Sequence, residues 1–230
     1  MGQIPSEISQ LTRLVTLDLS FDLVDTNLKI SNLQKFIQNL TNIRQLYLDG
    51  IIITSQGHKW SKALMPLRDL QELSMSNCDL SGSLDSSLSR LENLSVVVLD
   101  GNKFSSPVPE TFANFQNLST LSLSDCGLTG TFPQKIFQIR TLSVIDLYDN
   151  PNLRGFFPDY SLSESLHSIV LSNTSFSGAL PHTIGNMTNL ILLDLSFCQL
   201  YGTLPNSLSN LTQLSSLYLD HNNLSGSIPS

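Results

Sequence analysis

The stretch LSDCGLTGTFP, residues 123–133, contains Cys126, one of only three cysteines in the 230-residue chain. The other two share a 24-residue spacing with it, since Cys78 lies two such periods before it and Cys198 lies three such periods after it. A fixed period of this length is typical of repeat architectures, in which each repeat forms one structural unit. The cysteines therefore occupy one position of a 24-residue repeat.

Aligning the chain on its cysteines gives the pattern L-x-x-L-x-x-L-x-L-x-x-(N/C/T)-x-L-x-G-x-(I/L/F/V)-P. The first two steps between repeats are longer than the others, and every later step keeps the 24-residue period. The alignment yields nine repeats, which start at Leu11, Leu40, Leu67, Leu91, Phe115, Ile139, Ser163, Met187 and Leu211.

Each part of the pattern predicts a local structure. The L-x-L segment, for example Leu121 and Leu123, alternates between core and solvent as a short β-strand does. Gly130 and Pro133 indicate the bends that follow the strand. An apolar residue three positions before each repeat start fits a helical or 3₁₀ turn that packs inward from the opposite side. These residues are Ile8, Ile37, Leu64, Leu88, Phe112, Ile136, Tyr160, Ile184 and Leu208.

A single repeat of this size cannot bury a core, so neighbouring repeats must share one. We predict one domain over residues 1–230, an α/β repeat protein that forms a right-handed solenoid. Short parallel strands line its concave face, and 3₁₀ turns, short helices and bends line its convex face. Residues 1–8 and 224–230 are incomplete repeats without caps, so we expect a fragment of a longer solenoid, truncated at both ends.

Two blocks depart from the 24-residue rule, and we expect both on the convex side. SNLQKFIQNL, residues 31–40, has helical spacing, and Ser31 with Gln34 fits a capping box. SQGHKWSKALMP, residues 55–66, predicts a short helix in which Trp60 packs into the core rather than contacting a ligand.

The cysteine position turns into the core directly after the strand, where backbone carbonyls of the turn lack partners. Asn, Cys and Thr all carry a small donor group that satisfies such carbonyls. The first two repeats have Asp22 and Ile51 at this position, and Ile51 interrupts the series because it has no donor. A redox or metal role for the cysteines is the alternative. The predicted buried structural ladder consists of Cys78, Asn102, Cys126, Asn150, Thr174, Cys198 and Asn222.

Composition narrows the classes of function. The formal net charge is −7 and the pI is about 4.9, which argues against nucleic acid or an anionic membrane surface as a partner. No motif of a hydrolase, a nucleotide-binding loop or a metal site occurs, and the four histidines share no metal-ligand spacing. We therefore expect a protein that is not an enzyme and has no cofactor and no metal.

The repeats resemble leucine-rich repeats, and the L-x-G-x-(I/L)-P half, as in Leu128-Gly130-Phe132-Pro133, resembles the plant extracellular subtype. The resemblance covers nearly all of the chain. Within that subtype the chain resembles the receptor-like proteins of plant immunity, closest to the Verticillium wilt resistance group. The segments that carry this likeness are LTRLVTLDLS, LYLDGIIITSQGHKWSKAL, VPETFANFQNLSTLSLSDCGLTGTFPQKIFQ and SFSGALPHTIGNMTNL.

That resemblance implies a non-catalytic ectodomain at the extracellular face of the plasma membrane. The whole protein would be a single-pass receptor without a kinase that signals through partner receptor kinases. Its ligand would be a protein or peptide, such as a microbial effector. The fragment itself shows no signal peptide and no transmembrane segment, and we expect no membrane contact by it.

The solvent-facing strand positions should form columns, because successive strands stack side by side. The first column contains Asp18, Tyr47, Ser74, Val98, Ser122, Asp146, Val170, Asp194 and Tyr218. The second contains Ser20, Asp49, Ser76, Asp100, Ser124, Tyr148, Ser172, Ser196 and Asp220. A third column beside the turn includes Phe21, Asp125, Asp149, Phe197 and His221.

Aromatic and apolar residues exposed among carboxylates are typical of a recognition face, although Asp and Ser also simply keep a sheet soluble. The acidic bias favours a basic partner. The candidate ligand contacts are Asp146, Tyr148, Val170, Asp194, Phe197, Tyr218 and His221.

Seven N-x-S/T sequons predict glycosylation sites on a secreted chain. Three of them, at Asn39, Asn186 and Asn210, share the position directly before a repeat start. A patterned glycan coat on the convex side would explain this shared position, and repetition of the repeat consensus explains it equally well. The full set is Asn39, Asn93, Asn117, Asn173, Asn186, Asn210 and Asn223.

Two other functions compete with an immune receptor-like protein. One is a secreted inhibitor of a microbial wall-degrading enzyme, a class that resembles this chain in its repeats but carries cysteine-paired caps. The other is the ectodomain of a leucine-rich-repeat receptor kinase for growth or hormone perception, which differs in the sequence that follows the ectodomain.

Overall fold

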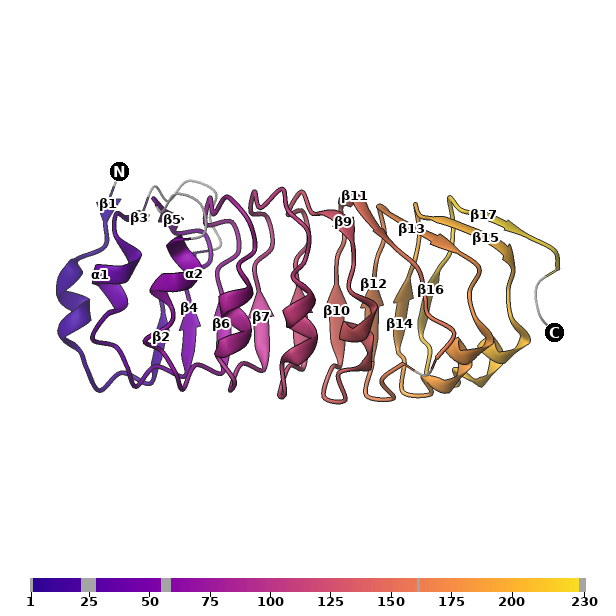
Figure 1. The fold of residues 1–230 in the computed structure, drawn as a ribbon, viewed down its shortest axis with the longest axis horizontal. Helices are drawn as coiled ribbons and strands as arrows, with labels where there is room; N and C mark the ends of the chain where they lie inside the picture. The colour runs from indigo at the N-terminus through magenta and orange to yellow at the C-terminus, as the bar shows by residue number, and fades with distance from the viewer. Residues whose placement is uncertain (1, 22–27, 55–58, 161, 228–230) are drawn as a thin grey trace.

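Figure 1 shows an elongated coil whose turns advance from the N-terminus to the C-terminus along its longest axis. The computed structural model describes residues 2–21, 28–54, 59–160 and 162–227, so the ladder position predicted at Asp22 lies outside the described residues. Nine parallel strands, one from each repeat, form what we call the main sheet. In spatial order they are β2 (Thr16–Asp18), β4 (Gln45–Tyr47), β6 (Glu72–Ser74), β7 (Val96–Val98), β8 (Thr120–Ser122), β10 (Val144–Asp146), β12 (Ser168–Val170), β14 (Leu192–Asp194) and β16 (Ser216–Tyr218).

The main sheet is held in one register throughout. The middle residue of each strand pairs with the middle residue of the next, from Leu17 and Leu46 in β2 and β4 to Leu193 and Leu217 in β14 and β16. These middle residues point into the core and are buried, except Leu217 in the last strand, which is 41% exposed. The two flanking residues of each strand therefore face outward.

Two smaller parallel sheets follow the turns after the main strands. Near the N-terminus, β1 (Gly2–Gln3), β3 (Leu28–Ile30) and β5 (Ile52–Ile53) pair in that order. The second sheet, which we call the flank sheet, runs toward the C-terminus along the upper edge of Figure 1. It consists of β9 (Thr129–Thr131), β11 (Asn150–Gly155), β13 (Thr174–Gly178), β15 (Gln199–Thr203) and β17 (Asn223–Ser225).

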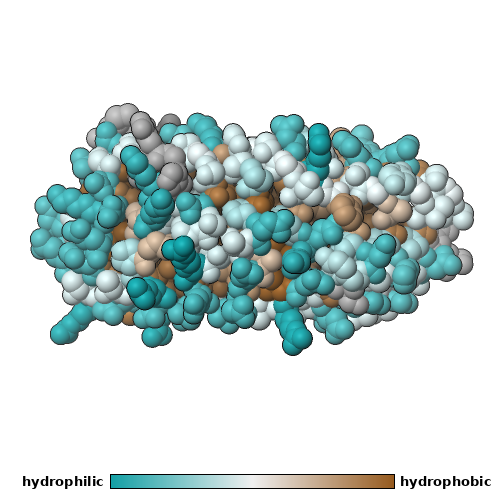
Figure 2. Space-filling view, viewed as in Figure 1, coloured by the Kyte–Doolittle hydropathy of each residue, from teal (hydrophilic) through white to brown (hydrophobic). Residues whose placement is uncertain are grey.

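Short helices complete most of the repeats, and Figure 2 shows their side of the molecule as largely hydrophilic with small separate apolar patches. The apolar residue predicted to face inward from this side is completely buried in six of the repeats, for example at Phe112 and Ile184. The α-helices are α1 (Leu33–Ile37) and α2 (Lys59–Ala63), and the 3₁₀-helices are η1 (Ser6–Gln10), η2 (Ser86–Arg90), η3 (Glu110–Asn114), η4 (Gln134–Gln138), η5 (His182–Asn186) and η6 (Asn206–Asn210).

The prediction for Tyr160 was wrong. Tyr160 is exposed and lies in no helix, whereas Phe157 and Leu162 are buried in this repeat. The cause is one extra residue in β11, where the pairing with β13 shifts between Asn150 and Arg154. The insertion moves the following Gly-x-Phe-Pro segment one position along the chain and leaves no room for the usual helical turn.

The helix in the first long repeat has a different cap from the predicted one. The capping box of Ser31 and Gln34 is not formed; instead Asn32 Oδ1 accepts a hydrogen bond of 2.9 Å from the backbone N–H of Lys35. An Asn at this position satisfies one of the unpaired donors of the first turn. In the second long repeat Trp60 is completely buried and its ring lies 5.6 Å from that of Phe104, so it packs as predicted.

The residues that follow each main strand form a ladder of buried hydrogen bonds. Asn150 Nδ2 donates to the carbonyls of Leu123 and Leu147, both at 2.9 Å, and its Oδ1 accepts from the N–H groups of Cys126 and Leu128. Asn102 makes the same four bonds two repeats earlier. Asn222, which is half-buried in the last repeat, donates to the carbonyls of Leu195 and Leu219 and accepts from the N–H of Leu200. Each Asn thus joins the backbone of its own repeat to that of the preceding repeat.

The cysteines take the same place with fewer bonds. The thiols of Cys78, Cys126 and Cys198 lie 3.0, 3.2 and 3.2 Å from the carbonyl oxygens of Leu48, Leu99 and Leu171. All three are free and buried. Burial raises the pKa of the Cys78 and Cys126 thiols to about 12 and raises that of Cys198 as well. Because the thiolate is the reactive form, these cysteines are inert in the folded chain.

We therefore expect the three thiols to resist a maleimide or disulfide reagent at pH 7 until a denaturant unfolds the chain. After unfolding, three equivalents of reagent should react per chain, and mass spectrometry of timed samples measures both stages. Rapid labelling of any of the three in native buffer would contradict the structural role.

Candidate ligand-recognition surface

The outward residues of the main sheet form a continuous surface, which we call the outer face. Its first column follows from the strand pairing, since each strand's last residue lies beside the last residue of the next. Asp146 pairs with Val170, Val170 with Asp194, and Asp194 with Tyr218. Four of the candidate contact residues therefore occupy four consecutive strands.

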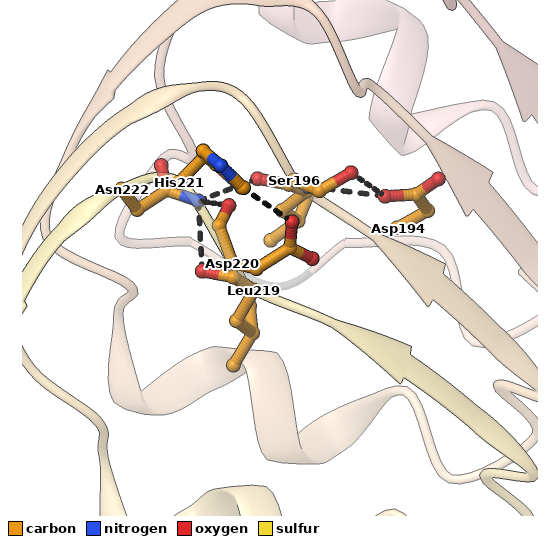
Figure 3. Close-up of polar contacts among 7 residues, drawn as sticks. Asp194, Ser196, Leu219, Asp220, His221 and Asn222 are labelled. Atoms are coloured by element: carbon orange, nitrogen blue, oxygen red, sulfur yellow. Dashed lines mark hydrogen bonds and ion pairs between the residues drawn. The ribbon is translucent and has the colours of Figure 1, made fainter.

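Serine hydroxyls hold several carboxylates of the outer face in place. Asp194 accepts a hydrogen bond of 2.9 Å from the hydroxyl of Ser172. It also accepts from the hydroxyl of Ser196 at 2.7 Å and from the backbone N–H of the same residue (Figure 3). Asp146 Oδ1 accepts from the Ser124 hydroxyl and from the N–H of Tyr148. These bonds fix the position of both carboxylates without neutralising their charge.

The third column has an unusual backbone. Asp125, Asp149, Asn173, Phe197 and His221 all have positive φ, between 49° and 57°, and occupy the same position in five consecutive repeats. Asn and Asp tolerate this left-handed conformation, but for a bulky residue such as Phe it is a genuine outlier. Strained positions of this kind cluster at functional sites.

The two rings at the end of this column stack on each other. The ring centroids of Phe197 and His221 lie 4.0 Å apart with an interplanar angle of 11°. His221 Nδ1 lies 2.7 Å from Asp220 Oδ2, as Figure 3 shows. Phe197 is 52% exposed and Tyr218 is 50% exposed. The stack and Tyr218 together present an aromatic platform to solvent at the C-terminal end of the outer face.

All seven candidate contacts are exposed or half-buried, and six of them fall into two groups of neighbours. Asp146 and Tyr148 lie on β10 and the turn after it, and Asp194, Phe197, Tyr218 and His221 lie on β14, β16 and their turns. Val170 lies between the two groups and is half-buried.

The side chains of the outer face that carry a full charge at neutral pH are all acidic. Its three columns contain no Lys or Arg at any described position, whereas Asp recurs in each column. Asp100 is one of the half-buried carboxylates of this face. Burial raises its pKa, and the neighbouring Asp146 and Asp49 raise it further, although hydrogen bonds from Ser122 and Ser124 oppose the shift. The outer face therefore favours a cationic partner.

Sequence reasoning missed two features of this surface. Tyr47 donates a hydrogen bond of 2.5 Å to Glu72, and this bond raises the pKa of Tyr47 to about 12 and lowers that of Glu72. The Phe197–His221 stack was also missed. The 24-residue spacing of these two residues was the available signal, because it predicts that they lie side by side.

The seven sequon asparagines are all exposed. Asn93 and Asn117 donate to the carbonyls of Arg68 and Glu92 in the preceding repeats, and Asn173 donates to Asp149 on the outer face. Asn39, Asn186 and Asn210 make no side-chain hydrogen bond within the described residues. Glycosylation at these sites remains a prediction.

Other kinds of site are not formed by the described parts of the chain. No group of three or more His, Cys, Asp or Glu side chains lies close enough to hold a metal ion among residues 2–21, 28–54, 59–160 and 162–227. Over the same residues, no helix has the length and apolar character needed to cross a lipid bilayer.

Comparisons with known proteins agree with the repeat analysis. A family profile described as leucine rich repeat matches residues 164–224, and a second profile of the same description matches residues 69–91 and 117–139. A search of curated proteins gives no significant match.

Several solved structures have the same fold. The Arabidopsis receptor kinase HAESA, solved with the peptide hormone IDA and the co-receptor SERK1, superposes with a TM-score of 0.82 and 28% identity over 99% of this chain and 37% of that one. The plant peptide hormone receptor RGFR1, solved with RGF2, superposes with a TM-score of 0.79 and 26% identity over 99% of this chain and 39% of that one. This chain thus spans less than two fifths of either receptor.

A plant ice-binding protein superposes with a TM-score of 0.82 and 24% identity over 100% of this chain and 71% of that one. This likeness is evidence for the fold alone. The predicted fold class is confirmed: the chain is a leucine-rich-repeat solenoid with parallel strands and short 3₁₀-helices, like those of plant receptor ectodomains.

The raised pKa of Asp100 makes a prediction about stability. Because its pKa is higher in the folded state than in the unfolded state, its favourable contribution is complete below about pH 4 and is lost as the pH rises through the folded-state pKa. Asp100→Asn keeps an acceptor oxygen for Ser122 and Ser124 but removes the charge. The difference in free energy of unfolding, variant minus wild type, should therefore be more favourable at pH 7 than at pH 4.

Urea unfolding at the two pH values measures this difference, and Asp69→Asn, at an exposed residue in the turn before β6, serves as the control. If Asp100→Asn changes the free energy of unfolding by the same amount at both pH values, burial does not raise the pKa of Asp100.

Proposed function

We propose that this chain is the ligand-recognition segment of a plant cell-surface receptor, and that it binds a protein or peptide through the outer face of the main sheet. The observation that carries the proposal is the pairing of an exposed aromatic platform, Phe197, His221 and Tyr218, with fixed carboxylates at Asp146 and Asp194. Exposed aromatics beside charges are typical of binding hot spots. The segment acts by binding, and catalysis is not part of its role.

The finer proposal is an immune receptor-like protein that signals through partner receptor kinases at the plasma membrane. It is supported by the resemblance of the segments at residues 46–64 and 108–138 to the Verticillium wilt resistance group. The alternative, an ectodomain of a receptor kinase, is favoured by the likeness to HAESA and RGFR1, whose structures contain peptide hormones. The coding sequence downstream separates the two, since one predicts a short cytoplasmic tail and the other a kinase.

Selection from a phage-displayed library of random dodecapeptides tests recognition by the outer face. Selected peptides should be enriched in Lys and Arg, and Phe197→Gly should weaken their binding about tenfold or more. Glycine adopts the left-handed conformation without the steric strain that Phe bears there, and this relief offsets part of the stacking lost with the ring, so the variant should still fold.

Tyr201→Ser is the matched control, because Tyr201 is 54% exposed but lies on the flank sheet. If the selected peptides bind wild type, Phe197→Gly and Tyr201→Ser equally well, recognition does not occur on the outer face.

Neutralising both fixed carboxylates provides a second test. Asp146→Asn with Asp194→Asn should slow association of the selected peptides at low salt and leave it nearly unchanged at high salt, because steering by charge is screened. Asp69→Asn with Asp159→Asn changes the net charge equally on exposed residues outside the outer face. Stopped-flow or surface-plasmon measurements give the rates, and equal slowing by both pairs would mean that only net charge matters.

A further inference from the structure

We propose that the outer face takes a polyproline II segment with a basic side chain at one position and an apolar side chain three residues away. This inference rests on the proposed function and specifies its ligand. It follows from the chemistry and the spacing of the left-handed column, Asp125, Asp149, Asn173, Phe197 and His221.

The two ends of this column differ in chemistry. Their order in space is fixed because each of these residues except His221 donates its backbone N–H to a carbonyl of the next repeat, as Asp125 does to Tyr148 and Phe197 does to Asp220. Two carboxylates therefore lie side by side at one end and two stacked rings at the other, with Asn173 between them.

The acidic end is suited to a cation. Asp125 makes no side-chain hydrogen bond within the described residues, and Asp149 uses only Oδ1, which accepts from Asn173 at 2.5 Å. Tyr148, the residue before Asp149, is 48% exposed and offers a ring to the same ligand group. A guanidinium group can bond to carboxylates and stack on an aromatic ring at once.

The aromatic end is suited to an apolar group. The Phe197 and His221 rings lie nearly parallel, and both side chains are exposed at the surface although stacking buries one face of each ring. Phe197 keeps this position against the preference of its own backbone. An aliphatic or proline side chain would cover the remaining apolar surface of the stack.

The distance between the two ends selects the ligand conformation. Asp149 and Phe197 lie two strands apart, which is roughly 10 Å at about 4.8 Å per strand. An extended β-strand presents side chains on one side at about 7 Å and 13 Å, and neither spacing matches. A polyproline II helix has three residues per turn and a rise of about 3.1 Å, so residues three apart lie on one side at about 9 Å. Aromatic surfaces commonly dock such segments, whose preformed shape lowers the entropic cost of binding.

Synthetic proline nonapeptides that carry one Arg and one Leu test this spacing. Peptides with the two residues two, three or four positions apart, in both orders, are titrated into the chain by calorimetry or fluorescence polarisation. A separation of three should bind about tenfold or more tightly than the others in one of the two orders. A helical peptide with Arg and Leu seven positions apart, which also spans about 10 Å, is the competing ligand shape.

Variants of the two ends assign the contacts. Asp125→Asn with Asp149→Asn should abolish the preference for Arg over norleucine in the best nonapeptide and leave the preference for Leu over Ala. Phe197→Gly should do the reverse, and Tyr201→Ser on the flank sheet should change neither preference.

Equal affinity at all separations, tighter binding of the helical peptide, or no measurable binding of any nonapeptide would overturn the proposed spacing. The experiments distinguish failure of this spacing from failure of the proposed function. If phage-selected peptides lose affinity with Phe197→Gly but lack the Arg–Leu spacing, recognition by the outer face stands and only the polyproline II register is rejected.

Discussion

The buried hydrogen bonds made directly after each main strand are the constraint on which the rest of this structure depends. A short strand must end in a sharp turn to enter the next part of its repeat, and that turn leaves carbonyl and N–H groups unpaired inside the core. Asn102 and Asn150 pair these groups across neighbouring repeats, and the cysteines pair a smaller number. An unpaired buried polar group costs on the order of 1–3 kcal/mol, so the turn has little freedom.

A fixed turn has a direct consequence for function. In the last five repeats, the residue before each ladder position is held in the left-handed conformation, and its side chain falls at the same place in every repeat. Chemically different side chains at this place therefore form an ordered row with a spacing set by the strands. The acidic members Asp125 and Asp149 and the aromatic members Phe197 and His221 obtain their separation in this way, and a ligand can be recognised by distance as well as by charge.

Most of the fold could be predicted from the sequence because the repeat imposes one apolar period on it. The strand positions, the pairing of the columns and the buried cysteines all follow from that period. Two predictions were wrong because the 24-residue period does not contain the local detail that decides them. Tyr160 is exposed because β11 has a single extra residue, and the predicted cap at Ser31 is replaced by Asn32. For the recognition surface, the period places the residues side by side. It does not show that Phe197 and His221 stack or that Ser172 and Ser196 hold Asp194, because side-chain rotamers decide both.

The most direct test of this account is the free energy of unfolding of Asn150→Leu, measured by urea denaturation beside Cys126→Ser. Leucine is similar in size but leaves the carbonyls of Leu123 and Leu147 and two N–H groups without their partner, whereas serine keeps a donor. The account predicts a loss of about 3 kcal/mol or more for Asn150→Leu and less than about 1 kcal/mol for Cys126→Ser. A loss below about 1 kcal/mol for Asn150→Leu would contradict the claim that these buried bonds hold the turns and the recognition surface in place.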